Sequence, residues 1–223
     1  MGTTVSAVGV LDKSVSVLNA VAGEKLTLAE LVESTGLTRA TAHRLATALE
    51  AHGMLRRTAD GRFALGLHLL ALGRAAAVQY PLAERARPAM EALRDATGES
   101  VQLYVVDGDS RVCVAALESP HGLRTIVPVG AALSLEVGSA AHVLSGAHSG
   151  DPGWVESLGE REPGVGSVSA PVLGAGGTDG EAGEVVAAVS VSGPLDRIGP
   201  SPGERFGACL LYTSDAADEC VNV

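Results

Sequence analysis

The first part of the chain repeats apolar residues with the period of an α-helix. One apolar stripe, which predicts a helix over residues 10–22, is formed by Leu11, Val15, Leu18 and Ala22. Thr27 and Glu30 then have the Thr-x-x-Glu spacing of a capping box, in which each side chain bonds the backbone N–H of the other residue. This spacing predicts a second, short helix, and Gly36 supplies the left-handed residue that ends it.

A third helix is predicted to begin after Thr38, a favourable N-cap, and to end before Gly53. Its apolar positions, which we expect to face the first two helices, are Ala42, Leu45, Ala46 and Leu49. The opposite face consists of Arg39, Ala40, His43, Arg44 and Thr47. That face holds two arginines and no carboxylate, so it suits the major groove of duplex DNA, where Arg reads guanine and Ala meets the thymine methyl group.

A β-hairpin is predicted after the third helix. Residues 54–58 and 62–65 alternate around Asp60-Gly61, a dipeptide typical of tight hairpin turns. The hairpin carries three basic side chains, Arg56, Arg57 and Arg62. Three helices and a basic two-stranded wing make a winged helix-turn-helix, whose wing contacts phosphate or the minor groove. A three-helix bundle with solvated arginines is the alternative that periodicity leaves open.

The rest of the chain predicts a second architecture. An Ala/Leu-rich helix over 67–77 is apolar on more than one face, which fits packing against a second subunit or burial in its own domain. A helix with Met90 and Leu93 follows Pro88 and stops at Gly98. Strands are expected at 101–105, 112–117, 125–129, 165–172 and 185–191, with a short helix over 139–144. This order predicts an α+β fold on a mostly antiparallel sheet with flanking helices.

Charge is divided unevenly between these two regions. The chain has 223 residues and a net charge of −10, but residues 1–66 carry seven Lys or Arg against six Asp or Glu. Residues 67–223 carry nine against twenty. A small basic head on an acidic body is typical of a regulator that binds DNA. Aromatic residues make up only 3% of the chain, which argues against recognition of single-stranded RNA by base stacking.

The sequence lacks the usual signs of catalysis, metal binding or membrane insertion. The three cysteines have no CxxC spacing and the six histidines no HExxH spacing, so we expect neither a metal nor a cofactor. No Gly-x-Ser-x-Gly or Ser-x-x-Lys motif marks an enzyme. The glycine-rich run at 174–183 lacks the Lys of a phosphate loop, so we interpret it as a flexible hairpin loop. Without a secretory signal or an apolar run of about 18 residues, we expect a cytoplasmic protein.

The assembled motifs resemble the IclR family of bacterial transcription regulators. The resemblance covers about residues 10–205 and is carried by LAELVESTGLTRATAHRLATALEAHGML, RRTADGRFALG, TGESVQLYVVDGD, VPVGAALSLEVGSAAHVL and GVGSVSAPV. It implies a winged helix-turn-helix over 1–66, a linker helix over 67–81 and a GAF-like effector domain over 82–206. Within the family, the chain is most similar to actinobacterial regulators of amino-acid metabolism.

The resemblance also implies a function and the residues that carry it. Such proteins are homodimers or homotetramers that bind pseudo-palindromic operators in double-stranded DNA, most often as repressors, and respond to a small effector. By analogy, the DNA-binding residues would be Thr38, Arg39, Thr41, His43, Arg44 and Thr47, with Arg56, Arg57 and Arg62 on the backbone. The effector pocket would be lined by Gly130, Gly138, Ser139, Ala140, Ser167, Ser169, Ser190 and Ser192.

Gly138-Ser139 stands at the start of the predicted helix over 139–144, where free backbone N–H groups favour an anion. We therefore expect the effector to be an organic acid or an amino acid. Alternatively, these serines and glycines only permit close packing in a sheet. A second functional hypothesis is a small-molecule sensor or protein-interaction module without specific DNA binding.

The chain departs from the family pattern in two places. The passage 145–153 is shorter than the helical excursion of the family, which predicts an open or defective pocket. The tail over 207–223 shows no amphipathic pattern, and we interpret its run LYTSDAADE as translated sequencing adapter. We then expect the terminal helix of the family to be missing and part of the sheet to lose its cover.

Overall fold

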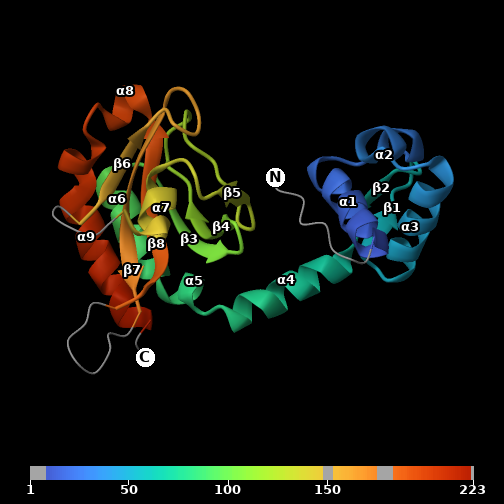
Figure 1. Cartoon of the computed structure of the whole chain (residues 1–223), viewed down its shortest axis with the longest axis horizontal. Coiled ribbons are helices and arrows are strands. Elements are labelled where there is room, and N and C mark those ends of the chain that lie inside the picture. The colour runs from blue at the N-terminus through green and yellow to red at the C-terminus, as the bar shows by residue number, and fades with distance from the viewer. Residues whose placement is uncertain (1–8, 148–152, 175–182, 222–223) are drawn as a thin grey trace. The chain divides into compact units, whose positions relative to one another are not determined.

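The computed structural model describes residues 9–147, 153–174 and 183–221. The chain divides into two compact units, of which one ends at Tyr80 and the other begins at Pro81 (Figure 1). Each unit has its own cluster of buried apolar side chains. Each therefore has the core that an independent domain needs.

The N-terminal unit has the helices and the hairpin that the sequence predicts. Its elements are α1 (Gly9–Gly23), α2 (Leu28–Thr35), α3 (Arg39–Ala51), β1 (Leu55–Arg57), β2 (Phe63–Leu65) and α4 (Leu67–Gln79). Thr27 and Glu30 make both hydrogen bonds of the capping box, and Gly36 ends α2 with a φ of 65°. The predicted caps of α2 are thus confirmed, because the local hydrogen bonds alone determine them.

The hairpin closes the core of this unit. Phe63 is fully buried and pairs with Leu26, which attaches β2 to the segment between α1 and α2. On α1 the buried side chains are Val17 and Val21. The predicted stripe was wrong, since its members Leu11, Val15 and Ala22 are exposed. Both sets have helical spacing, and only the packing of α2 and α3 decides which of them is covered.

Helix α4 confirms the predicted helix after the hairpin and extends it to Gln79. None of its residues is buried, so burial within its own domain, one of the two expectations, is wrong for the single chain. Its exposed apolar side chains include Leu67, Leu70, Leu72 and Val78. An all-round apolar helix that is exposed in one chain is typical of a surface that packs against another chain.

The C-terminal unit is built on one six-stranded sheet. Its strands are β3 (Ser100–Asp107), β4 (Ser110–Leu117), β5 (Ala132–Ser134), β6 (Val155–Leu158), β7 (Val165–Leu173) and β8 (Val185–Pro194). They lie in the order β5-β4-β3-β8-β7-β6, and each neighbouring pair is antiparallel. The helices are α5 (Leu82–Arg85), α6 (Arg87–Thr97), α7 (Ser139–His142), the π-helical turn η1 (Val143–Ala147), α8 (Leu195–Ile198) and α9 (Pro202–Val221). The predicted α+β fold is confirmed.

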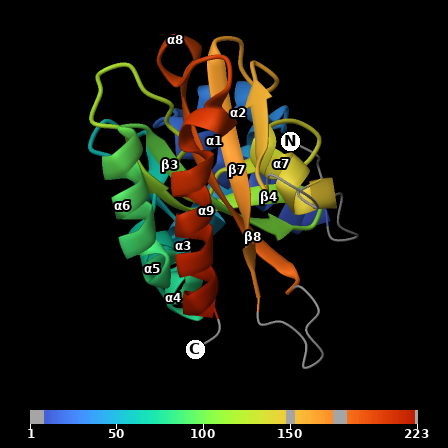
Figure 2. The ribbon, with the colours of Figure 1, turned by 90° about the vertical axis from the view of Figure 1, so that its left-hand side faces the viewer.

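Helices cover both faces of this sheet. Figure 2 shows α6 and α9 side by side on one face and α7 on the other. Side chains alternate between the faces along each strand: in β8, Val189 and Val191 lie in the core under α6 and α9, whereas Ser190 and Ser192 point to the side of α7. The sheet thus has one apolar face and one face that is partly polar.

Two strand predictions differ from the structure. Residues 125–129 form no strand, although Val127 is buried. The pairing edge of β4 is taken instead by the short strand β5, and the unpredicted β6 pairs with β7. β5 and β6 have only three and four residues of mixed polarity, which is too short for an alternation of polar and apolar residues to predict a strand.

The tail is helical as far as Val221, which corrects the expectation that the terminal helix is missing. Helix α9 begins at Pro202 and buries Phe206 and Leu210 against the sheet. These two positions are four residues apart, which places them on the same face of the helix. The sheet therefore keeps its cover, while the adapter origin of LYTSDAADE stays a prediction. Residues 175–182 of the loop expected at 174–183 lie outside the described residues, as do residues 148–152 of the shortened passage.

Candidate nucleic-acid interface and ligand cavity

The outer face of α3 is exposed as the sequence predicts. Arg39, Ala40, His43, Arg44 and Thr47 are all exposed, and the opposite face is buried. Thr38 is the N-cap: its hydroxyl accepts from the Thr41 N–H at 3.3 Å and lies 2.9 Å from the Thr41 hydroxyl. The two threonines therefore fix the start of the helix, and the side chains that remain available for a partner are those beyond it.

The three arginines of the hairpin differ in their surroundings. The Arg57 Nε donates to Glu50 at 3.3 Å, and its guanidinium lies 4.3 Å from the centre of the Phe63 ring. Arg62 donates to Glu30 at 2.8 Å and to the Lys25 carbonyl at 3.0 Å. Arg62 thereby joins the hairpin to the capping box of α2.

Arg39, Arg44 and Arg56 form a second group, which we call the open arginines. All three are exposed, and within the described residues none of them makes an ion pair with an Asp or Glu. An arginine without an internal ion pair can bind a phosphate or a base edge without first breaking a contact within the protein. The open arginines are therefore the strongest candidates for contact with an anionic partner.

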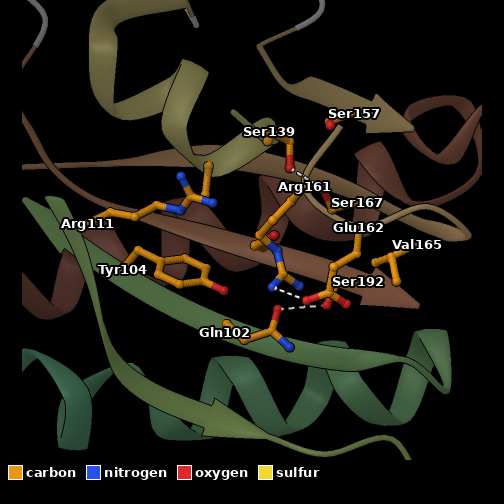
Figure 3. A pocket seen from close by; sticks show the side chains of 13 residues that line it. Gln102, Tyr104, Arg111, Ser139, Ser157, Arg161, Glu162, Val165, Ser167 and Ser192 are labelled. Carbon is orange, nitrogen blue, oxygen red and sulfur yellow. Dashed lines mark hydrogen bonds and ion pairs between the residues drawn. The ribbon is translucent and has the colours of Figure 1, made fainter. Parts of the chain in front are cut away.

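A small cavity of about 30 Å³ lies between the sheet and α7 in the C-terminal unit (Figure 3). Six of the predicted effector residues line it: Gly138, Ser139, Ala140, Ser167, Ser190 and Ser192. Ser169 lies directly beside it, where its hydroxyl is 2.7 Å from that of Ser139. Gly130 does not line the cavity and lies in an exposed turn that bonds the Cys113 backbone.

Charged and polar side chains that the sequence pattern does not indicate complete the cavity. They are Gln102 and Tyr104 from β3, Arg111 from β4, and Arg161 and Glu162 from the segment between β6 and β7. Arg111 is only 3% exposed, and Figure 3 shows its side chain beside Tyr104. Burial raises the pKa of Tyr104 and lowers the pKa of Arg111, because each charged form loses hydration.

A bulge explains why Arg111 faces the cavity. Leu103 pairs with Ala115, but the next residue, Tyr104, pairs with Cys113, so Val114 is an extra residue in β4. Strict alternation from Ala115, which lies under the helices, would place Arg111 on the same apolar face. The extra residue moves it to the side of α7. No signal in the strand sequence reveals the position of this bulge.

The segment 159–164 closes the cavity with charged groups. The Gly138 N–H, where we predicted an anion, donates to the Glu160 carboxylate at 2.8 Å, and His142 Nε2 lies 2.9 Å from the same oxygen. These contacts, that to Gly138 first, hold the pKa of Glu160 below its ordinary value. Arg161 donates to Glu162 at 2.6 Å. The backbone N–H of Gly138, which was expected to bind the effector, is thus hydrogen-bonded to the carboxylate of Glu160.

Other features of the described residues offer less chemistry. A wider depression of about 390 Å³ between α6 and α9 is lined by Ala92, Leu93, Ala96, Ala208, Cys209, Tyr212 and Thr213. It is larger than the cavity but presents no charged side chain. Among all the residues that the structure describes, no three His, Cys, Asp or Glu side chains come together as metal ligands. Among the described helices, none has the length and apolar character to cross a membrane.

Comparison with known proteins supports both units. Residues 10–59 match the family model of the IclR helix-turn-helix domain, and residues 74–152 match that of the C-terminal domain of the bacterial transcriptional regulator IclR. The regulator KipR of Bacillus subtilis is 35% identical over 133 residues, which are 59% of this chain and 53% of KipR. The chain thus matches about half the length of that relative.

A longer match and a solved structure extend the comparison. The glycerol operon regulatory protein of Streptomyces griseus is 28% identical, and the match covers 85% of this chain and 86% of that protein. An IclR homologue from Microbacterium hydrocarbonoxydans, solved in complex with 4-hydroxybenzoate, is similar in structure with a TM-score of 0.75. It is 20% identical, and the match covers 95% of this chain and 98% of that one. This likeness shows a shared fold.

Proposed function

The chain belongs to the IclR family of bacterial transcriptional regulators, and we propose on that premise that it is a repressor that binds a pseudo-palindromic operator. The observation that carries the proposal is the exposed face of α3 with its open arginines. Arg39 is the first residue of α3, and Arg44 lies five residues further along the same helix. From these positions both side chains reach base edges or phosphates in a major groove. Arg56, on the wing, holds the backbone beside it.

The positions of Arg57 and Arg62 refine this proposal. Both were expected to hold the DNA backbone, and both have acidic partners within the unit. An arginine that must leave a carboxylate gains less from a phosphate than a free one does. We therefore assign Arg57 and Arg62 mainly to the orientation of the wing, and Thr38 and Thr41 to the start of α3. His43 and Thr47 stay on the DNA-reading face.

We propose that the C-terminal unit is the effector domain, with the cavity as its binding site. The effector is a small organic acid or amino acid, which suits a cavity lined by hydroxyl groups and arginines. The 4-hydroxybenzoate complex of the Microbacterium homologue, which holds a carboxylate, supports this class. The domains we propose are 1–66 for DNA binding, 67–81 as linker and 82–206 for the effector, in a regulator of the cytoplasm without catalytic activity.

We further propose that two copies of the chain associate through α1 and α4. Exposed apolar side chains on these helices include Leu11, Val15, Leu67, Leu70 and Val78. Apolar side chains in such number are typical of a surface that a partner covers. A homodimer would present two copies of α3 to the two halves of a palindrome, and a homotetramer would pair two such dimers.

Footprinting on the DNA that flanks the gene of this protein tests the proposal and yields the operator sequence. Arg44→Ala should then weaken binding to that operator by about 1–3 kcal/mol if Arg44 reads a base, with a smaller effect on random duplex DNA. The matched control is Arg94→Ala, because Arg94 lies in the other unit and pairs with Asp95. Absence of binding to any duplex at low salt would refute DNA recognition and favour a protein-interaction module.

A further inference from the structure

Arg111 is a buried cation without a buried anion. It is 3% exposed, and among the described residues no Asp or Glu forms an ion pair with it. One terminal nitrogen donates to the Ser134 carbonyl, while the Nε is buried and has no hydrogen-bond partner. Its guanidinium carbon lies 5.6 Å from the centre of the Tyr104 ring. Removal of such a group from water is costly unless an anion or further acceptors compensate.

The residues around Arg111 leave its guanidinium without a neighbouring side chain that would neutralise its charge. Gly138 has a φ of 96°, and a Cβ at this position would lie 3.2 Å from the Arg111 guanidinium. The other charged lining groups, Arg161 and Glu162, pair with each other and add no net charge. Glu160, the other acid of the segment 159–164, is held by Gly138 and His142. The cavity therefore carries one uncompensated positive charge.

The rest of the lining consists mainly of neutral hydrogen-bonding groups. Ser192 donates to Gln102 at 2.9 Å, and Ser139 and Ser167 share a bond of 2.7 Å. Figure 3 shows these side chains and that of Tyr104 around one space, with the Arg161–Glu162 pair across from the Arg111 side. Such a lining fits a ligand with a single negative charge and a further hydroxyl or amino group.

We propose that Arg111 anchors the carboxylate of the effector, and that the effector is a small monocarboxylate with a hydroxyl or amino group that meets the Gln102–Ser192 side. This inference rests on the proposed role of the cavity as effector site. Arg forms bidentate hydrogen bonds with carboxylates, and the free Nε offers one of the donors that this geometry uses. The cavity of about 30 Å³ holds about one water molecule, so the segment 159–164 moves outward when such a ligand enters.

The test compares L-lactate with L-lactamide, which have the same shape and differ in charge. We measure the Tm of the full chain as each compound is titrated at constant ionic strength. L-lactate should raise the Tm in a saturable way and L-lactamide should not, because only the carboxylate pairs with Arg111. Arg111→Gln should reduce the affinity for L-lactate by about 10- to 100-fold, in line with a lost charge-assisted bond.

Two further variants keep the result interpretable. Arg111→Lys retains the charge without the bidentate geometry and should give an intermediate affinity, even if Arg111→Gln folds poorly. Arg94→Gln, in the same unit but paired with Asp95, should behave as the wild type. Equal shifts with L-lactamide, no shift with L-lactate, or an undiminished shift in Arg111→Gln would each overturn the proposal. Because no DNA is present, a failure to bind an operator would leave this result unchanged.

Discussion

The salt dependence of DNA binding gives a direct test of the open arginines. The perturbation is Arg56→Gln, which removes one charge from the wing. Arg56 is exposed, so the substitution leaves the composition of the core unchanged. Three open arginines per bound copy, if all neutralise phosphates, give a slope of about −3 in a plot of log K against log salt. Loss of Arg56 should reduce its magnitude by about 1 for each bound copy, since every phosphate contact releases about 0.9 counterions.

The assay is fluorescence anisotropy on a random duplex over a range of salt concentrations, so that base reading contributes little. Arg57→Gln is the matched comparison on the same strand and should change the slope less, because Glu50 already compensates Arg57. Arg94→Gln should leave the slope at its wild-type value. If Arg56→Gln and Arg57→Gln change the slope equally, the division into open and internally paired arginines does not govern binding.

Two further predictions concern the C-terminal unit. Burial raises the pKa of Cys113 to about 11, so iodoacetamide at pH 8 should label the exposed Cys209 but not Cys113. Peptide mass mapping measures the labelling, and labelling of both cysteines at similar rates would contradict the burial of Cys113. The pKa of Glu160 is held below its ordinary value of 4.5, so its contacts stabilise the fold above that pH and are lost as the pH falls through the lower value. The Tm of the wild type should therefore fall more steeply below pH 4.5 than that of Glu160→Gln, and parallel curves would argue against the contact.

The parts of the fold that the sequence predicted well depend on neighbouring residues. Thr27, Glu30 and Gly36 form their caps within one helical turn, so spacing alone was sufficient. The buried side of α1 was predicted wrongly, because two apolar sets have helical spacing and the choice depends on helices further along the chain. The same distinction separates the exposed face of α3, which was predicted, from the internal pairing of Arg62 with Glu30, which was not.

The cavity shows the same division between local and distant causes. The family resemblance pointed to Ser167, Ser190 and Ser192 as effector residues, and they do line a common space. Arg111 escaped prediction because a bulge sets its direction, and Arg161 because it comes from a segment without periodic pattern. Single strands reveal which face a residue joins, whereas the charges that meet across the sheet depend on register and tertiary packing.

The extra residue in β4 makes the polarity of the binding face depend on a local irregularity of the backbone. If β4 kept all its residues but paired with β3 without the bulge, Arg111 would move from Val106 to Asp107, and its guanidinium would turn to the apolar layer beneath α6 and α9. Deletion of Val114 would instead remove the bulge and leave Arg111 opposite Val106, on the side of α7. A homologue that is one residue shorter at this point therefore retains the same electrostatic arrangement, whereas substitutions that straighten the strand at full length would abolish it.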